Sequence, residues 1–332
     1  MEVSPTKNLP PPPGIINSIK AGFDAIANHI TAIFLPLLLN LFLWLGPRLR
    51  MDVLFNSMKA DMIFTWQAFG MSPENIQKGM TWYETTLPRV NLFWIFRTIP
   101  IGISSLFPSR DASQTPWGAP SIMQVSETGL FGWIFLLTLV GWIGGGLYFR
   151  SVAWLAMADK DAQPMQVSRA ISQTMLMSIF WGVLSVFGGI PVLFILAAIF
   201  QQALQLGALA AYLFVLFLSM SSMWVIVPLF FWPHGVFVKQ QNFVTSILSS
   251  VQLARFTLPT SSMVVLTVFL LTFGLNFVWS IPPKDSWMTL FGIFGHSFVT
   301  TALLAGSFIY YHDMNIWLQG AIEKLRTVSA VK

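Results

Sequence analysis

Histidine is the residue type in this sequence best suited to holding a cofactor, because cysteine is absent from all 332 residues. Of the four histidines, only His296 falls inside a long apolar stretch, whereas His29, His234 and His312 fall at the ends of such stretches. His296 is therefore the candidate ligand of a haem or pigment, although a transmembrane b-type haem usually needs two imidazoles at matched depth. The simpler expectation is that His296 hydrogen-bonds across helices to a serine or threonine and that the other three lie near lipid headgroups.

Other catalytic or metal-binding patterns are missing from the sequence. All 13 Asp and Glu residues lie outside the apolar stretches, so no relay of buried carboxylates is expected. The sequence contains no HExxH, no CxxC, no GxSxG and no glycine-rich phosphate loop. It therefore predicts a protein that is not an enzyme and that holds neither a cofactor nor a metal.

A few residues interrupt the apolar stretches with an amide, a glycine or a proline. Glycine and proline can unwind a span and free carbonyls for a cation, and an amide can line a polar pathway. The same residue types also serve packing, since amides bond across helices with about 0.6 to 2 kcal/mol. A pathway role and a packing role both stay open for six residues: Asn40, Gly188, Gly189, Pro191, Pro228 and Asn276.

Composition decides the class of protein. Hydrophobic residues make up 55% of the chain and charged residues only 9%, against about a quarter charged in an average soluble domain. The net charge of +5 comes from scattered basic residues rather than from the clusters that a nucleic-acid-binding protein shows. The sequence thus predicts an all-α integral membrane protein that contacts membrane lipids and no nucleic acid.

The apolar stretches predict about six transmembrane helices. They cover residues 31–46, 129–149, 175–200, 208–232, 259–281 and 288–311. A further apolar run, 92–107, contains Arg97, and an arginine in mid-bilayer costs about 2.5 to 3.5 kcal/mol. We interpret this run as re-entrant or interfacial rather than as a seventh span.

The spacing of the spans suggests an internal repeat. Every second span starts about 80 residues after the previous one, and short amphipathic stretches precede the first, third and fifth spans. We predict three pseudo-repeated hairpins with cytoplasmic interfacial amphipathic helices, behind a disordered Pro-rich tail. The predicted divisions are 1–14 (tail), 15–160 (with an extracytoplasmic insertion at 47–128), 161–241, and 242–332 (ending in an interfacial helix).

Two runs resemble known membrane proteins. The run VPLFFWPHGVFVKQQNFVTSILSSVQLARFTLP (227–259) resembles the linker and helix of a broad, poorly characterised class of bacterial polytopic membrane proteins. It is similar to the membrane domain fused to some glycerophosphodiester phosphodiesterases. The opening GFDAIANHITAIFLPLLLNLFLWLGPRL (22–49) resembles multi-span proteins of filamentous green bacteria. The resemblance implies a helical membrane module without a catalytic motif.

Location and orientation follow from these features. The resemblance implies the inner (plasma) membrane of a bacterial cell. Basic residues favour the cytoplasmic side of a membrane, and their distribution predicts that both chain termini are cytoplasmic. Arg48 and Arg50 lie beside the first span and argue for the opposite orientation.

Three functions fit the sequence. The leading hypothesis is a non-enzymatic accessory, assembly or structural subunit of a membrane complex, which binds other membrane subunits through the aromatic-rich insertion 47–128. The alternative is a lipid or small-solute transporter that uses the amide, glycine and proline positions. A haem- or pigment-binding subunit built on His296 is the third.

Overall fold

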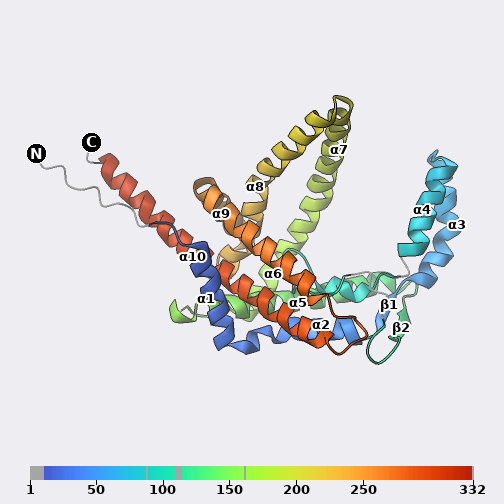
Figure 1. The fold of residues 1–332 in the computed structure, drawn as a ribbon, viewed down its shortest axis with the longest axis horizontal. Coiled ribbons are helices and arrows are strands. Elements are labelled where there is room, and N and C mark those ends of the chain that lie inside the picture. The colour runs from blue at the N-terminus through green and yellow to red at the C-terminus, as the bar shows by residue number, and fades with distance from the viewer. Residues whose placement is uncertain (1–10, 87–88, 109–113, 161, 331–332) are drawn as a thin grey trace, which may run out of the picture. The chain divides into compact units, whose positions relative to one another are not determined.

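The computed structural model describes residues 11–86, 89–108, 114–160 and 162–330, and most of the predicted tail lies outside these ranges. Helices account for 79% of the structure, which confirms the nearly all-α class. The α-helices in chain order are α1 (Ile15–Asn28), α2 (Phe34–Leu45), α3 (Asp52–Ala68), α4 (Pro73–Thr86), α5 (Leu130–Ala156), α6 (Val167–Leu184), α7 (Ile190–Gln205), α8 (Ala208–Lys239), α9 (Phe243–Trp279) and α10 (Thr289–Ala330) (Figure 1).

Short elements connect these helices. Strands β1 (Arg48–Arg50) and β2 (Ile122–Gln124) pair in parallel, with Arg48 opposite Ile122. The remaining elements are 3-10 helices η1 (Ile30–Ile33), η3 (Leu92–Phe96) and η4 (Ala158–Lys160), and a π-helical turn η5 (Ser185–Gly189) between α6 and α7.

Within the described residues, five helices are long and apolar enough to cross a membrane, or six if α1 and α2 form one bent span. The two helices meet at an angle of 95°. Because α2 has only 12 residues, it is about 18 Å long, which is shorter than the roughly 30 Å hydrocarbon layer. A multi-pass membrane protein is therefore supported, and the three-hairpin repeat remains a prediction.

The expected interfacial stretches are continuous with the spans beside them. Helix α6 begins at Val167 and runs on into the predicted third span. Helix α9 begins at Phe243 and contains one non-helical residue, Thr257, two positions before Pro259. A proline inside a helix removes one backbone hydrogen bond and bends the axis, so the stretch 243–256 is set off from the rest of α9 by a kink.

The chain forms two compact units, each assembled from separate parts of the sequence. Unit 1 comprises residues 1–32, 149–273 and 299–332, and unit 2 comprises 33–148 and 274–298. The units are described separately below.

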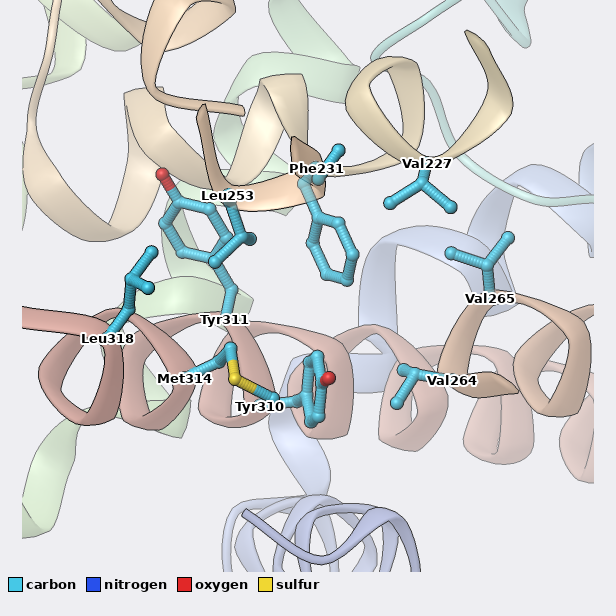
Figure 2. Close-up of a cluster of buried hydrophobic side chains, with 10 residues drawn as sticks. Val227, Phe231, Leu253, Val264, Val265, Tyr310, Tyr311, Met314 and Leu318 are labelled. Carbon is cyan, nitrogen blue, oxygen red and sulfur yellow. The ribbon is translucent and has the colours of Figure 1, made fainter. Parts of the chain in front are cut away.

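The core of unit 1 lies around the middle of α10. Tyr310 and Tyr311 are fully buried there, and Phe231 of α8 stacks on both rings at centroid distances of 5.9 and 5.8 Å. Figure 2 shows these rings between α8 and α10, with aliphatic side chains of α9 such as Val264 completing the cluster. Among the candidate spans, α10 is thus the best buried one.

Helix α1 approaches α10 closely at a pair of glycines. A Cβ atom placed on Gly22 would lie 2.3 Å from the backbone nitrogen of Gly306 and 2.5 Å from the carbonyl oxygen of Ala302. Close approach of two backbones through small residues is a usual way for membrane helices to associate. Gly22 therefore fixes α1 against α10 within unit 1.

Unit 2 is organised by the end of α2. Arg48 is 1% exposed, and its guanidinium donates to the carbonyl oxygens of Leu43 and Trp44, which are among the last acceptors of that helix. A cation at a helix C-terminus stabilises the free carbonyls and the helix dipole. The indole of Trp44 donates to the Lys284 carbonyl at 2.7 Å. Arg48 thus has a structural role at the end of α2.

The insertion 47–128 contains a helical hairpin, α3 and α4, with a small core of its own. Ile76, Met80 and Tyr83 are buried against α3, and the Tyr83 hydroxyl donates to the Phe55 carbonyl at 2.8 Å. Burial raises the pKa of Tyr83. Phe64 and Phe69 remain exposed on the same hairpin, as the sequence predicts for an aromatic-rich surface.

The Gly22 contact makes a prediction about stability. Gly22→Ala should lower the free energy of unfolding in detergent by about 1–3 kcal/mol, because the added methyl group overlaps the α10 backbone. The matched control is Gly320→Ala on α10, where an added Cβ meets no atom within 4 Å. The control should leave stability unchanged or raise it slightly. Equal thermal unfolding curves for the two variants would contradict the contact.

Candidate functional site

The polar residues singled out from the sequence separate between the two units. Asn40, Asn276 and His296 belong to unit 2, whereas the glycine and proline positions 188–191 and 228 belong to unit 1. The three unit 2 residues converge on the non-helical segment that follows η3. We call this group, Asn40, Ser104, Asn276 and His296, the Ser104 cluster.

Asn40 joins α2 to the non-helical segment. It is fully buried, and its Nδ2 donates to the carbonyl oxygen of Pro36 at 2.7 Å and to that of Ser104 at 3.4 Å. Its Oδ1 accepts a hydrogen bond from the Leu106 backbone N–H at 2.8 Å. Both ends of the amide are therefore occupied by the backbone of this chain.

His296 forms the other half of the cluster. Its ring is fully buried, and Nδ1 lies 2.5 Å from Oδ1 of Asn276. The backbone carbonyl of Ser104 lies beside the ring. A neutral imidazole that carries its proton on Nδ1 donates to Oδ1 of Asn276. The expected cross-helix bond is present, and its partner is an asparagine.

Glycines let the non-helical segment pack tightly on α5. A Cβ on Gly145 would lie 2.8 Å from the carbonyl oxygen of Ile101, and one on Gly141 would lie 2.7 Å from Cγ2 of Thr98. The close approach at Gly141 and Gly145 of α5 is thus made by a loop of the same chain. The segment 92–107 is not a continuous helix, which agrees with the re-entrant or interfacial interpretation.

Arg97 lies at the start of this segment. Its guanidinium carbon is 4.8 Å from the ring centroid of Trp94, and burial lowers its pKa. Among the described residues, its Nε has no hydrogen-bond partner. The cation–π contact offsets part of the cost of burying the charge.

The glycine and proline positions of unit 1 do not unwind the backbone. Gly189 and Ile190 have right-handed helical torsions, and the Ile190 N–H donates to the Ser185 carbonyl in a π-helical turn. Pro228 lies inside the continuous helix α8. The carbonyl oxygens proposed for cation binding are therefore held within helical geometry.

The remaining histidines lie in unit 1. His234 is 2% exposed and its Nε2 lies 2.8 Å from the Ser307 hydroxyl, so its expected place among lipid headgroups is wrong. The rings of Phe230, Phe231 and Phe308 pack around it at centroid distances of 4.8 to 5.2 Å. Pro233 directly precedes His234 in α8. The aromatic residues nearby in the sequence, such as Phe230 and Phe231, were the available signal that His234 is buried.

His312 takes part in an ion-pair group instead. Lys160 pairs with the Asp313 carboxylate, and His312 Nδ1 lies 3.0 Å from the same carboxylate. No group of three or more His, Cys, Asp or Glu residues that could hold a metal occurs among the described residues.

Comparison with protein-family models, with curated proteins and with solved structures finds no match to this chain.

Asn40 should be essential to the packing of unit 2. Asn40→Leu removes the acceptor for the Leu106 N–H and leaves buried polar groups without partners, which should cost about 1–3 kcal/mol. Leu38→Ala on the exposed side of the same helix should cost much less, because Leu38 is 45% exposed. Thermal unfolding in detergent measures both, and equal losses would contradict the role of the amide.

The His296–Asn276 pair should show coupling in a double-mutant cycle. The single variants His296→Leu and Asn276→Leu and their combination should give a coupling energy of about 0.6 to 1.7 kcal/mol, the range of hydrogen bonds between membrane helices. The cycle is measured by unfolding in detergent. Strictly additive losses would mean that the two side chains do not stabilise each other.

Proposed function

We propose that this chain is a non-enzymatic subunit that assembles with other helices in a bacterial inner membrane. The observation that carries the proposal is the exposure of its central hairpin. In the apolar window of Val167–Gln205 none of the residues is buried, and in that of α8 only 6% are, compared with 72% in α10. Figure 1 shows α7 and α8 joined at a turn, from which they diverge as a hairpin. These two spans have most of their surface available for contact.

Exposure to lipid alone does not bring helices together, because lipid tails are as apolar as leucine side chains. Small and weakly polar residues do, since they permit close backbone contact and interhelical hydrogen bonds. Gly182, Ser185 and Gly189 recur at helical spacing along α6 and η5. An added Cβ on Gly182 would meet no atom within 4 Å. This face is therefore open to another helix.

Helix α8 adds hydroxyl groups to the same hairpin. Ser219 donates to the Val215 carbonyl at 2.8 Å, and Ser222 donates to the Ser219 carbonyl at 2.7 Å. Each hydroxyl is thus satisfied by its own helix, so it tolerates lipid and can also accept a hydrogen bond from a neighbouring span.

The insertion offers a second surface for the same role. Phe64 and Phe69 of the α3–α4 hairpin are 72% and 82% exposed. Exposed aromatic side chains at this density favour contact with a protein or a membrane. The proposal assigns this surface to another subunit of the same complex.

A lipid or small-solute transporter is the second function considered. A groove of about 370 Å³ in unit 2 favours it, lined by apolar residues of α2 and α5 and by Phe96 and Ile103. The Ser104 cluster argues against a transporter, because the amide of Asn40 already hydrogen-bonds to the backbone of this chain.

Native co-purification with mass spectrometry tests the proposal. A stoichiometric membrane partner should be retained by the wild-type protein and lost or strongly reduced in Gly182→Leu, because the larger side chain prevents close helix contact. Gly274→Leu is the matched control, since an added Cβ at Gly274 also meets no atom within 4 Å.

The control variant should keep the partner. Retention of the partner by Gly182→Leu and by Gly274→Leu alike would contradict assembly through the α6 face. A monodisperse wild-type protein without any partner, extracted in a mild detergent, would contradict the proposed function altogether.

A further inference from the structure

Unit 1 contains a pocket of about 390 Å³ at one end of its spans. Its walls are the C-terminal part of α5, the connection 162–165 and the C-terminal end of α8. Because both helices end here, the pocket lies where apolar spans give way to polar residues, which is the depth of lipid headgroups.

The walls of the pocket are fixed by contacts within unit 1. Phe149 packs on Phe237 at a centroid distance of 5.6 Å and joins the ends of α5 and α8. Gln240 has a left-handed backbone conformation that ends α8, and its Nε2 donates to the Gln163 carbonyl at 2.9 Å. The connection 162–165 is thereby tied to the end of α8.

The charge of the pocket is positive. Arg150 and Lys239 line it, and no carboxylate is among the described residues that do so. Arg150 donates through Nε to the Met165 carbonyl, and Lys239 donates to Oδ1 of Asn315 at 2.7 Å. The Met165 carbonyl and the Asn315 amide are both neutral oxygen acceptors. Each cation therefore keeps its charge and further N–H donors for a ligand.

A third cation lies beside the pocket. Arg169 of α6 donates through Nη2 to the carbonyl oxygen of Gln240, again a neutral partner. Lys160 shows the contrast, because its charge is balanced by Asp313. Trp154, which lines the pocket, is 44% exposed, and tryptophan favours the headgroup level of a bilayer.

We propose that this pocket, built by Arg150, Lys239 and Trp154, binds a phosphate group, and that its ligand in the membrane is the phosphodiester headgroup of an anionic phospholipid. Basic pockets between spans bind such headgroups by charge-assisted hydrogen bonds. The guanidinium of Arg150 offers its two terminal nitrogen atoms to the phosphate oxygens, and the Lys239 ammonium adds a point charge. The site is independent of the proposed assembly, since it uses no residue of the α6 face.

The test is a lipid titration of the full-length protein in neutral detergent, followed by native mass spectrometry. The probes are dioctanoyl phosphatidylglycerol, dioctanoyl phosphatidylcholine and inorganic phosphate. The wild-type protein should bind phosphatidylglycerol more tightly than phosphatidylcholine. Arg150→Gln and Lys239→Gln should each weaken phosphatidylglycerol binding roughly fivefold, as the loss of one basic contact predicts.

The matched control is Arg255→Gln, which removes the same charge from an exposed position of α9 outside the pocket. It should leave the affinity unchanged, and the charge-preserving Arg150→Lys should retain most of it. Competition by inorganic phosphate at equal concentration would support the phosphate site and identify its ligand as the free ion. Equal phosphatidylglycerol affinity in wild type and both glutamine variants would overturn the proposal.

A footprint on the wild-type protein avoids any effect of the variants on folding. Phosphatidylglycerol should slow acylation of the Lys239 amine by an amine-reactive ester, and it should leave acylation of exposed Lys20 unchanged. Phosphatidylcholine should protect neither lysine. Equal labelling of Lys239 with and without phosphatidylglycerol would contradict occupation of the pocket.

Discussion

Unit 2 depends on the need to satisfy the backbone of a non-helical segment among apolar helices. A helix satisfies its own N–H and C=O groups, whereas the residues from Arg97 to Phe107 do not. Asn40 supplies a donor and an acceptor to this segment from α2, and His296 reaches the Ser104 carbonyl from α10. Gly145 lets the segment approach α5 so closely that a Cβ would lie 2.8 Å from a carbonyl oxygen. Helices α2, α5 and α10 thus all contact this one irregular segment.

Several features of the fold could be predicted from the sequence, because they depend on composition and on local hydrophobic runs. The apolar stretches beginning near residues 129, 208 and 288 correspond to α5, α8 and α10. The interruption of the run 92–107 by Arg97, Pro100 and Gly102 was enough to predict that it does not form a continuous helix. The sequence also singled out the asparagines, the histidine and the glycines inside the spans, because polar residues are costly in apolar spans unless they have partners.

The partners themselves could not be predicted, because a single sequence does not reveal which faces meet. Asn40 bonds to Leu106, which is 66 positions away. The burial of His234 was missed for the same reason: it lies near the end of a predicted span, yet Ser307 of α10 and several aromatic rings enclose it. The kink at Thr257 follows from Pro259, but the π-helical turn at Ser185–Gly189 has no comparable local signal.

Polar side chains in the spans fall into two physical classes. Ser219 and Ser222 are short, and each bonds to a carbonyl of its own helix. Such residues leave the helix free to move and to meet new neighbours. Asn40 and His296 have longer side chains that reach backbone groups of other segments, so they hold one arrangement. In unit 2, Asn40 and His296 hydrogen-bond to other segments of the chain, whereas Ser219 and Ser222 of the α7–α8 hairpin hydrogen-bond within their own helix. Because Ser219 and Ser222 bond within their own helix, the α7–α8 hairpin is the part of the chain that we propose for assembly.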